Sequence, residues 1–344
     1  MALEIKKVLN ALLDGNDLSA DEMEAVIGAV MDGGIDPIQT AGILAALRAK
    51  GETGAEVAAA ARAMRQRAVR VTAPEGAIDT CGTGGDGADT INISTASAIV
   101  AAAAGVPVAK HGNRAVSSSC GSADVLEALG VRLDLDVPAL ETMLDEVGLA
   151  FLFAQVHHPA TRAVVPVRKA LGVRTVFNLL GPLTNPAGVA RQVMGVWGAD
   201  VQPLAAEALA ALGAEHALVV HSDDGLDELS VAAPTTVIEV RDGEVAARWK
   251  LDPGDLGIRF TDPEALRGGG VGESARRLSA ILEGSESSTA SEAVALNASA
   301  ALYVGGKAAS IFDGLETARD LLATGAAGRT LEKLATRSQE LGRG

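Results

Sequence analysis

The chain has 344 residues, of which 48% are hydrophobic and only 2% are aromatic, and its formal net charge is −15. This length allows two domains with aliphatic cores, whereas the acidity and the scarcity of aromatic rings argue against a nucleic-acid partner. No long apolar run predicts a membrane span, and residues 1–17 predict an amphipathic helix rather than a signal peptide. We therefore expect a cytoplasmic protein with no membrane partner.

The first seventy residues predict a small all-α unit. Ser19–Glu22 and Thr53–Glu56 have the spacing of capping boxes, and Asp36-Pro37 supplies an N-cap followed by proline at the first helical position. A Pro/Gly-containing connection follows at residues 71–76, so we expect a small helical domain over residues 1–70. The expected helices cover residues 3–13, 20–32, 37–50 and 54–67.

From residue 71 onward, short apolar runs alternate with helical segments, which predicts βαβ units and a mostly parallel sheet. A hairpin is expected around Asp242-Gly243, and the tail from about Ser288 is expected to be helical. The predicted fold class is therefore α/β, with the small helical domain packed on a larger α/β domain over residues 71–344. Expected strands cover residues 78–81, 106–109, 149–154, 192–197, 216–220, 235–241 and 244–251. Expected helices cover residues 95–104, 123–129, 137–147 and 202–212.

A glycine-rich loop, DTCGTGGDGADTINIST, follows the first predicted strand at residues 79–95. It is not a Walker A loop, because Ala88-Asp89 follows Gly87, and it matches the dinucleotide-binding fingerprint only weakly. We expect hydroxyls of the Asn92–Thr95 segment to cap the next helix, whose N-terminus would then present N–H groups to an anion together with the glycines. The alternative is an ordinary capped turn between a strand and a helix.

The next predicted strand leads into a second candidate anion-binding loop, Lys110–Ser118, which precedes another helix. A lysine, an arginine and a row of hydroxyls are unusual neighbours in an acidic chain, and they suit phosphate. Because the carboxyl ends of parallel strands lie at one sheet edge, the two loops predict a ligand with more than one phosphate group.

A basic cluster and an acidic loop occur later in the chain. Helical spacing would place Arg162 and Lys169 on one face and Arg168 elsewhere, so a solvated basic face explains most of the cluster, which also includes Arg174. We expect only one of these residues to contact a ligand. The loop Asp223–Glu228 holds four carboxylates, which suit Mg²⁺ carried by a phosphorylated substrate but also suit a solvated turn.

Other common catalytic and metal patterns are missing from the sequence. The two cysteines, Cys81 and Cys120, have no metal-ligand spacing, and we expect them to fill tight loop packing in a reducing compartment. The five histidines form no metal motif, and no nucleophile elbow is present.

Taken in order, these loops closely resemble those of the anthranilate phosphoribosyltransferases, which share a fold with the nucleoside phosphorylases. The resemblance extends over nearly the whole chain. The matching segments are residues 82–86 (GTGGD), 92–95 (NIST), 110–114 (KHGNR), 121–127 (GSADVLE), 174–186 (RTVFNLLGPLTNP) and 227–230 (DELS). Where many family members have Lys-Ser, this chain has Ser119-Cys120, which removes one positive charge beside the expected pyrophosphate position.

The resemblance implies transfer of a phosphoribosyl group from phosphoribosyl pyrophosphate to the amine of anthranilate, in tryptophan biosynthesis. It also implies a homodimer formed through the small domain, which mid-chain helices around residues 160–190 complete. The implied donor ligands are Gly82, Gly85, Asp86, Thr90, Asn92, Ile93, Ser94, Thr95, Lys110, His111, Gly112, Asn113, Arg114, Ala115, Val116, Ser117, Ser118 and Ser122. The implied anthranilate ligands are Gly82, Asn113 and Arg168. The implied metal ligands, for two Mg²⁺ ions, are Ser94, Asp227 and Glu228.

No obligatory general base is expected, because neutralising the departing pyrophosphate and aligning an already uncharged aromatic amine are sufficient. Three alternatives are open at this point: a pyrimidine-nucleoside phosphorylase, an enzyme of the ordinary phosphoribosyltransferase fold, and a non-catalytic nucleic-acid-binding relative. The Asn92–Thr95 and Lys110–Arg114 segments disfavour the first. The sequence after Asp223-Asp224 lacks the phosphate loop of the second, and the charge of −15 disfavours the third.

Overall fold

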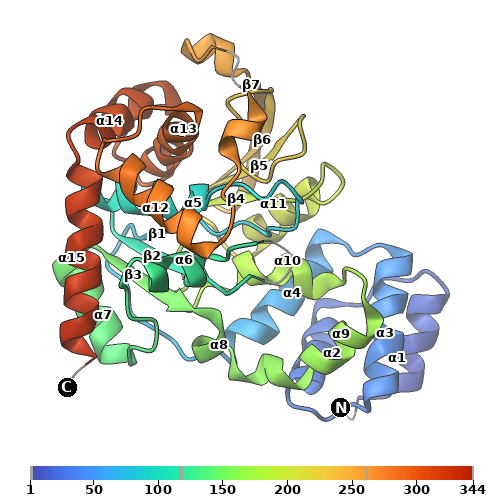
Figure 1. Ribbon diagram of the computed structural model, residues 1–344. Coiled ribbons are helices and arrows are strands. Elements are labelled where there is room, and N and C mark those ends of the chain that lie inside the picture. Colours follow the sequence, from blue (N-terminus) through green and yellow to red (C-terminus); the bar gives the residue numbers. More distant parts are fainter. Residues whose placement is uncertain (1–2, 116–118, 260–261, 343–344) are drawn as a thin grey trace.

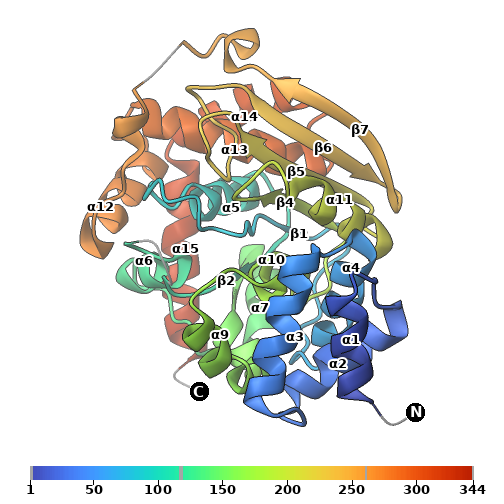
Figure 2. The ribbon, with the colours of Figure 1, turned by 90° about the vertical axis from the view of Figure 1, so that its right-hand side faces the viewer.

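A computed structural model describes residues 3–115, 119–259 and 262–342 of the chain (Figures 1 and 2). Val116, Ser117 and Ser118, expected above at the donor site, lie outside the described residues. Within those ranges, every helix is too short or too polar to cross a membrane.

The N-terminal residues form the four helices that the sequence predicts, and they gather at one corner of the molecule (blue in Figure 1). Both capping boxes are present, at Ser19 and at Thr53, and the Asp36 side chain accepts a hydrogen bond from the Ile38 N–H. The apolar faces of these helices share one core with two mid-chain helices, α9 (Val165–Leu171) and α10 (Val176–Leu183). The four are α1 (Ile5–Leu13), α2 (Ala20–Met31), α3 (Pro37–Lys50) and α4 (Gly54–Arg65).

A seven-stranded sheet forms the centre of the larger part, in the order β3-β2-β1-β4-β5-β6-β7. The first five strands in this order are parallel, and β6 and β7 add an antiparallel hairpin at one edge. The predicted α/β class with a helical N-terminal part is thus confirmed. The strands are β1 (Ile78–Asp79), β2 (Val108–Gly112), β3 (Leu149–Phe153), β4 (Arg191–Gly195), β5 (His216–Ser222), β6 (Thr235–Arg241) and β7 (Glu244–Leu251).

Helices cover both faces of the sheet, which is why its central strands are continuous apolar runs. In β5, Leu218 and Val220 belong to the core beneath the C-terminal helices, whereas Ala217 and Val219 belong to the core shared with the N-terminal helices. The remaining helices are α5 (Ile93–Ala103), α6 (Ser122–Ala128), α7 (Val137–Val147), α8 (Ala154–His157), α11 (Gln202–Ala211), α12 (Val271–Leu282), α13 (Thr289–Val304), α14 (Ile311–Ala323) and α15 (Ala326–Leu341). Three 3₁₀ helices cover Pro159–Ala163, Pro253–Leu256 and Pro263–Leu266.

The strand order reverses between β1 and β4. The chain leaves β1 toward β2 on one side and later returns through β4 on the other, which is the topology that forms a ligand-binding crevice beyond the carboxyl ends of two such strands. The glycine-rich loop leaves β1 at this point. The topology therefore places the loop where open parallel sheets bind their ligands.

Several predicted boundaries are wrong, and the hydrogen bonds explain the largest differences. β1 ends at Asp79 rather than at residue 81, because the Asp79 carboxylate accepts the His111 N–H in place of a strand carbonyl. β2 instead continues to Gly112, because it stays paired with β3 over its whole length. The predicted helical tail is confirmed, because Ser288 is the N-cap of α13, but α12, which begins at Val271, precedes it as a helix that was not predicted.

A buried ion pair joins α3 to α4, and a hydrogen bond from the same carboxylate adds the segment that precedes α2. These contacts yield a stability prediction. The Glu56 carboxylate accepts the Leu18 N–H at 2.9 Å, the Thr53 N–H at 2.9 Å and the Lys50 ammonium at 2.8 Å, and its side chain is 0% exposed. Glu56→Ala removes the buried charge partner of Lys50, leaves the buried Leu18 N–H without its acceptor and frees the Thr53 N–H, so the free energy of unfolding should fall by roughly 3–5 kcal/mol in urea titrations.

Asp17→Ala is the matched control for this prediction. Asp17 contacts the same ammonium at 2.6 Å, but its side chain is 60% exposed, so its loss should cost less than about 1 kcal/mol. Equal losses in the two variants would show that Glu56 does not anchor these helices.

Candidate active site

The glycine-rich loop is fastened to the ends of two other strands. Its Thr83 N–H donates to Gly195 O at the end of β4 (2.9 Å), and the Thr83 hydroxyl accepts the Trp197 N–H (3.1 Å). Its Gly84 N–H donates to the Asp227 carboxylate, beyond β5, at 2.7 Å. The loop is therefore held across the crevice between β1 and β4, in a position to present its other N–H groups to a ligand.

Glycine is required where the end of β4 and the glycine-rich loop approach Asp227. A Cβ atom on Gly195 would lie 1.5 Å from the Asp227 carbonyl oxygen, and one on Gly82 would lie 3.1 Å from the Asp227 carboxylate. Within the loop, Gly84, Gly85 and Gly87 have φ of +63°, +79° and +80°. These backbone conformations strain any residue with a Cβ, so the glycines allow both the close approach and the turn.

The helix after the loop begins earlier than predicted, and the expected hydroxyl cap is wrong. α5 starts at Ile93 with Asn92 as its N-cap, and the Asn92 side chain donates to Cys120 O (3.1 Å) instead of accepting a helix N–H. Ser94 and Thr95 therefore lie inside the first turn, where a hydroxyl cannot cap. The helix N-terminus consequently keeps N–H groups without a side-chain cap, and that of Ser94 faces the Glu228 carboxylate.

Three carboxylates converge beside the loop. The Asp86 carboxylate accepts the Asp227 N–H at 3.4 Å, and Glu228 follows Asp227 directly. Burial, together with the charge of Asp86, raises the pKa of Asp227 to about 7. Burial and the charge of Asp227 raise the pKa of Glu228 well above its ordinary value, and the Lys110 ammonium offsets this only in part.

This acidic group fits a magnesium site. Mg²⁺ prefers oxygen ligands and usually binds through one or two carboxylates together with substrate phosphates. Burial and mutual repulsion both disfavour the charged forms of these carboxylates, and a divalent cation would supply the countercharge that favours them.

The second loop begins inside the sheet rather than after it, which corrects the expectation of a continuous loop from residue 110. Lys110 and His111 belong to β2 and are buried. The Lys110 ammonium donates to the Thr80 hydroxyl at 3.2 Å, on the side of Glu228, whereas the His111 Nδ1 contacts Gly181 O at 3.1 Å. The Lys110 ammonium thus lies beside the start of the glycine-rich loop, and the His111 imidazole faces α10.

Residues 113–115 of this loop bond to one another and to α6. Arg114 pairs with Asp124 (3.0 Å) and Glu127 (2.8 Å), and its guanidinium lies over the Phe153 ring. The Ala115 N–H donates to the Asp124 carboxylate, and the Ser122 hydroxyl donates to Asn113 O at 3.2 Å. A Cβ on Gly112 would lie 2.4 Å from that hydroxyl, which explains this glycine. The Arg114 charge is therefore already paired with two acids.

Distant segments join the two loops to each other. Thr90 forms an isolated β-bridge with Arg267, and the Ser119 hydroxyl donates to Gly269 O at 3.0 Å. The Ser119 N–H also donates to the Asp89 carboxylate at 3.0 Å. Residues 267–269 thus connect both loops, a link with no signal in the sequence. The side chain of Ile93, also expected at the donor site, is buried in the core.

The basic cluster does not lie on one helix, so the predicted common face of Arg162 and Lys169 is wrong. Arg162 lies in a 3₁₀ helix, whereas Arg168 and Lys169 lie in α9. The Arg168 guanidinium lies over the Phe177 ring, 5.7 Å from its centroid, and burial lowers its pKa. Since Arg168 makes no ion pair within residues 3–115, 119–259 and 262–342, its charge is available to a ligand.

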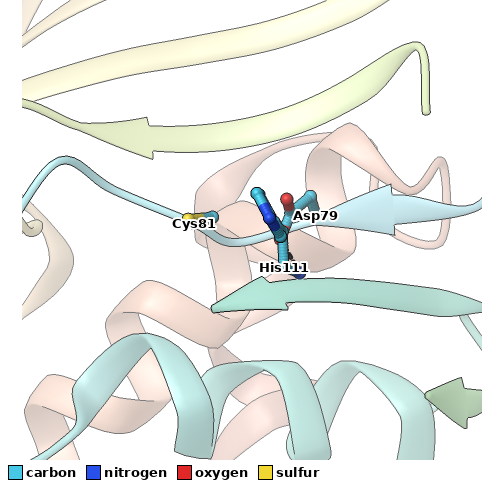
Figure 3. Close-up of side chains that lie close together, drawn as sticks. All are labelled: Asp79, Cys81 and His111. Carbon is cyan, nitrogen blue, oxygen red and sulfur yellow. Dashed lines mark hydrogen bonds between the residues drawn. The ribbon is translucent and has the colours of Figure 1, made fainter. Parts of the chain in front are cut away.

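The structure brings together three residues that no sequence pattern grouped (Figure 3). One ligand atom each from Asp79, Cys81 and His111 lies within 4.8 Å of the other two. The Asp79 carboxylate, however, already accepts bonds from the Thr80 and His111 N–H groups and from Asn185. Burial also raises the pKa of the Cys81 thiol and keeps it protonated. We interpret Asp79, Cys81 and His111 as a hydrogen-bonded structural cluster that holds the end of β1 in place, not as a metal centre.

The comparisons with known proteins agree with this geometry. A model of the glycosyl transferase family a/b domain matches residues 74–328, and one of that family's helical bundle domain matches residues 6–68. An anthranilate phosphoribosyltransferase of Rubrobacter xylanophilus is 50% identical over 99% of both chains. The chain belongs to the anthranilate phosphoribosyltransferase family. It is therefore an enzyme, a glycosyltransferase with the activity of that family.

Solved structures of the anthranilate phosphoribosyltransferase family match the whole fold. The enzyme of Thermus thermophilus has a TM-score of 0.92 and 45% identity, over 96% of this chain and 99% of its own. The enzyme of Saccharomyces cerevisiae, solved in complex with PRPP and Mg, has a TM-score of 0.88 and 26% identity, over 98% of both chains. These matches favour the transferase over the nucleoside phosphorylase, the ordinary phosphoribosyltransferase fold and the non-catalytic relative.

The raised pKa of Asp227 predicts that the free energy of unfolding falls as the pH rises through neutrality. Because the pKa of Asp227 is about 7 in the folded protein and 3.8 ordinarily, the folded protein keeps a proton that the unfolded chain has released between these values. The stabilising contribution of that proton is complete below about pH 4 and is lost as the pH rises through 7. Asp227→Asn, which stays neutral, should therefore raise the melting temperature in EDTA more at pH 8 than at pH 5.

Asp223→Asn, which changes an exposed acid of the same loop, is the control and should show the same small effect at both pH values. A gain for Asp227→Asn that is larger at pH 5 would contradict the proposed crowding of negative charge.

Proposed function

We propose that the chain transfers the phosphoribosyl group of phosphoribosyl pyrophosphate to the amine of anthranilate, which gives N-(5′-phosphoribosyl)anthranilate and pyrophosphate. The observation that carries this proposal is the meeting of the glycine-rich loop with the acidic pair at the crevice between β1 and β4. The Gly84 N–H donates to the Asp227 carboxylate, so one loop can present N–H groups to a pyrophosphate beside the metal ligands.

The donor site is assigned to the two loops. Free N–H groups of the glycine loop, such as that of Asp86, would bind the pyrophosphate, and the buried Lys110 ammonium would add positive charge. Asn92 and Ser119 fix the loops to each other, so the donors are held in place before the ligand arrives. The roles of Thr90, Thr95 and residues 111–118, with Ser122, stay predictions from the resemblance.

The acceptor site is assigned to Gly82, Asn113 and Arg168. The Arg168 guanidinium is half-buried over an aromatic ring and, among the described residues, has no acidic partner, which suits the carboxylate of an aromatic acid. The Asn113 carboxamide oxygen accepts the Arg114 N–H (2.8 Å) and the Gln155 amide (3.3 Å), so its orientation is fixed.

Asp227 and Glu228 would hold Mg²⁺, with Ser94 as a further ligand and Asp86 alongside. When bound, the metal supplies positive charge that stabilises the leaving pyrophosphate. The chain's own groups orient both substrates, and none has to move a proton before the amine attacks. We propose two ions, because three carboxylates and a pyrophosphate offer more oxygen ligands than one ion requires.

We further propose a small helical domain over residues 1–70, completed by the helices around residues 160–190, and a larger domain over residues 71–344. The shared core of α1–α4 with α9 and α10 supports this division. We propose a cytoplasmic homodimer that joins through the small domain, where Leu13 and Ile38 are 72% and 82% exposed. Sedimentation of the wild type and of a Leu13→Glu/Ile38→Glu variant would test the dimer.

The activity is tested most directly by the loss of anthranilate fluorescence. Fluorescence should fall only when enzyme, phosphoribosyl pyrophosphate and Mg²⁺ are all present. Loss of signal without the phosphoribosyl donor, or phosphate-dependent cleavage of thymidine by the same protein, would contradict the proposal.

The acidic pair predicts a metal-dependent loss of turnover. Asp227→Asn combined with Glu228→Gln removes both negative charges while preserving side-chain shape, so kcat/KM should fall by at least about 100-fold. Part of this loss should be recovered at high Mg²⁺ concentration, measured in the fluorescence assay. Near-native Mg²⁺-dependent turnover in the double variant would contradict the metal assignment.

Arg168 predicts a loss that is specific to the acceptor. Arg168→Ala removes a charged hydrogen-bond donor, so the KM for anthranilate should rise by about 10- to 100-fold, with a smaller change in the KM for the donor. Arg162→Ala, which changes an exposed arginine of the same segment, should leave both constants near the wild type. An effect of Arg168→Ala confined to the phosphoribosyl donor would reverse the two roles.

A further inference from the structure

The exposed side chain of Arg174, in the turn between α9 and α10, reaches across to the glycine-rich loop. Its Nη2 donates to Gly85 O at 2.6 Å, and its guanidinium lies over the Trp197 ring, 4.9 Å from the ring centroid. Trp197 is itself attached to the loop, because its backbone N–H donates a hydrogen bond to the Thr83 hydroxyl. Both partners of the guanidinium thus belong to the loop or to the turn attached to it.

This contact decides which way one peptide group of the loop points. The Gly85 carbonyl and the Asp86 N–H belong to the same trans peptide, so they point in opposite directions. With the carbonyl held toward Arg174, the Asp86 N–H points to the other side of the loop. That N–H has no acceptor in the part of the chain that the structure describes, so it is free to bind an anion.

The loop backbone would not hold this orientation by itself. Gly84 and Gly85 both have positive φ, and glycine exchanges between positive and negative φ at little cost. A rotated Gly85–Asp86 peptide would direct a carbonyl oxygen, with its partial negative charge, at the ligand. The arginine, through a charged hydrogen bond and a stacked ring, favours the orientation that presents the N–H.

We propose that Arg174 is a positioning residue for the pyrophosphate group: it fixes the Gly85–Asp86 peptide of the glycine-rich loop from the helical side of the crevice. This inference rests on the proposed donor site. It gives Arg174 a role distinct from that of Arg168, six residues earlier, which faces the acceptor. The two arginines flank Gly172, whose φ of +63° ends α9 and turns the chain back toward the loop.

Steady-state kinetics with three variants test the proposal. Arg174→Ala should raise the KM for phosphoribosyl pyrophosphate by about tenfold or more, as expected for a lost charged hydrogen bond, and change kcat and the KM for anthranilate by less than about twofold. Arg174→Lys can still donate to the carbonyl but lacks the planar stacking group, so it should recover part of the loss. Lys169→Ala, an exposed neighbour on α9, is the matched control and should equal the wild type.

Hydrogen–deuterium exchange without substrates separates positioning from direct contact with the donor. A peptide spanning residues 82–89 should exchange faster in Arg174→Ala than in the wild type or Lys169→Ala, because the Thr83 and Gly84 N–H groups lose their protection when the loop loosens. A raised donor KM with unchanged exchange would overturn the proposal in favour of direct ligation. A change in the KM for anthranilate alone would also overturn the proposal.

The exchange measurement does not depend on turnover. If the wild type failed to consume anthranilate, the proposed function would fall, while the exchange result would still decide whether Arg174 holds the loop.

Discussion

The mutual repulsion of three carboxylates governs this site. Asp86, Asp227 and Glu228 lie together at the end of the sheet, and burial, together with the charge of the neighbouring carboxylate, raises the pKa values of the latter two. A folded protein tolerates such a cluster only where hydrogen-bond donors and a nearby cation offset part of the charge. The Gly84 N–H and the buried Lys110 do so here, and they leave a remaining demand for positive charge that a magnesium ion can meet.

The close approach of backbone segments is what makes this crowding possible. β4 and the loop after β5 meet where Gly195 leaves no room for a Cβ, and the glycine-rich loop closes over both. Hydrogen bonds thus join the described parts of the two loops into one frame, which is attached at Thr83 to β4 and at Asp89 to Ser119. In a transfer reaction that depends on alignment and charge neutralisation, a frame set before binding lowers the barrier without any proton transfer.

The segment from α9 to the start of α10 contributes positively charged side chains near these loops. α9 and α10 share a core with the N-terminal helices, yet α9 carries Arg168, at the proposed acceptor site, and the turn that follows α9 carries Arg174 to the glycine loop. Under the proposed assignments, residues 168–174 serve both substrate sites, so the docking of this segment would connect the two sites mechanically. The fold thereby explains why an acidic chain keeps a basic cluster in this segment.

The sequence by itself determined the local structure and the chemistry of the loops. Helix starts at Ser19, Asp36 and Thr53 follow from their caps, and the hairpin at Asp242-Gly243 follows from its turn, because these signals act over a few residues. The family, its fold class and its activity also followed, since the resemblance rests on motifs in fixed order. The roles of individual site residues stay predictions.

Only the tertiary structure decided which distant groups meet. The short β1 depends on the Asp79 carboxylate accepting the His111 N–H, and the start of α5 at Ile93 leaves the expected hydroxyls without a capping role. The carbonyl contact of Arg174 joins residues 89 positions apart, and no local pattern distinguished it from the other arginines of its segment. The physical reason is the same in each case: a hydrogen bond between distant segments depends on how the sheet and helices pack, which no short stretch of sequence encodes.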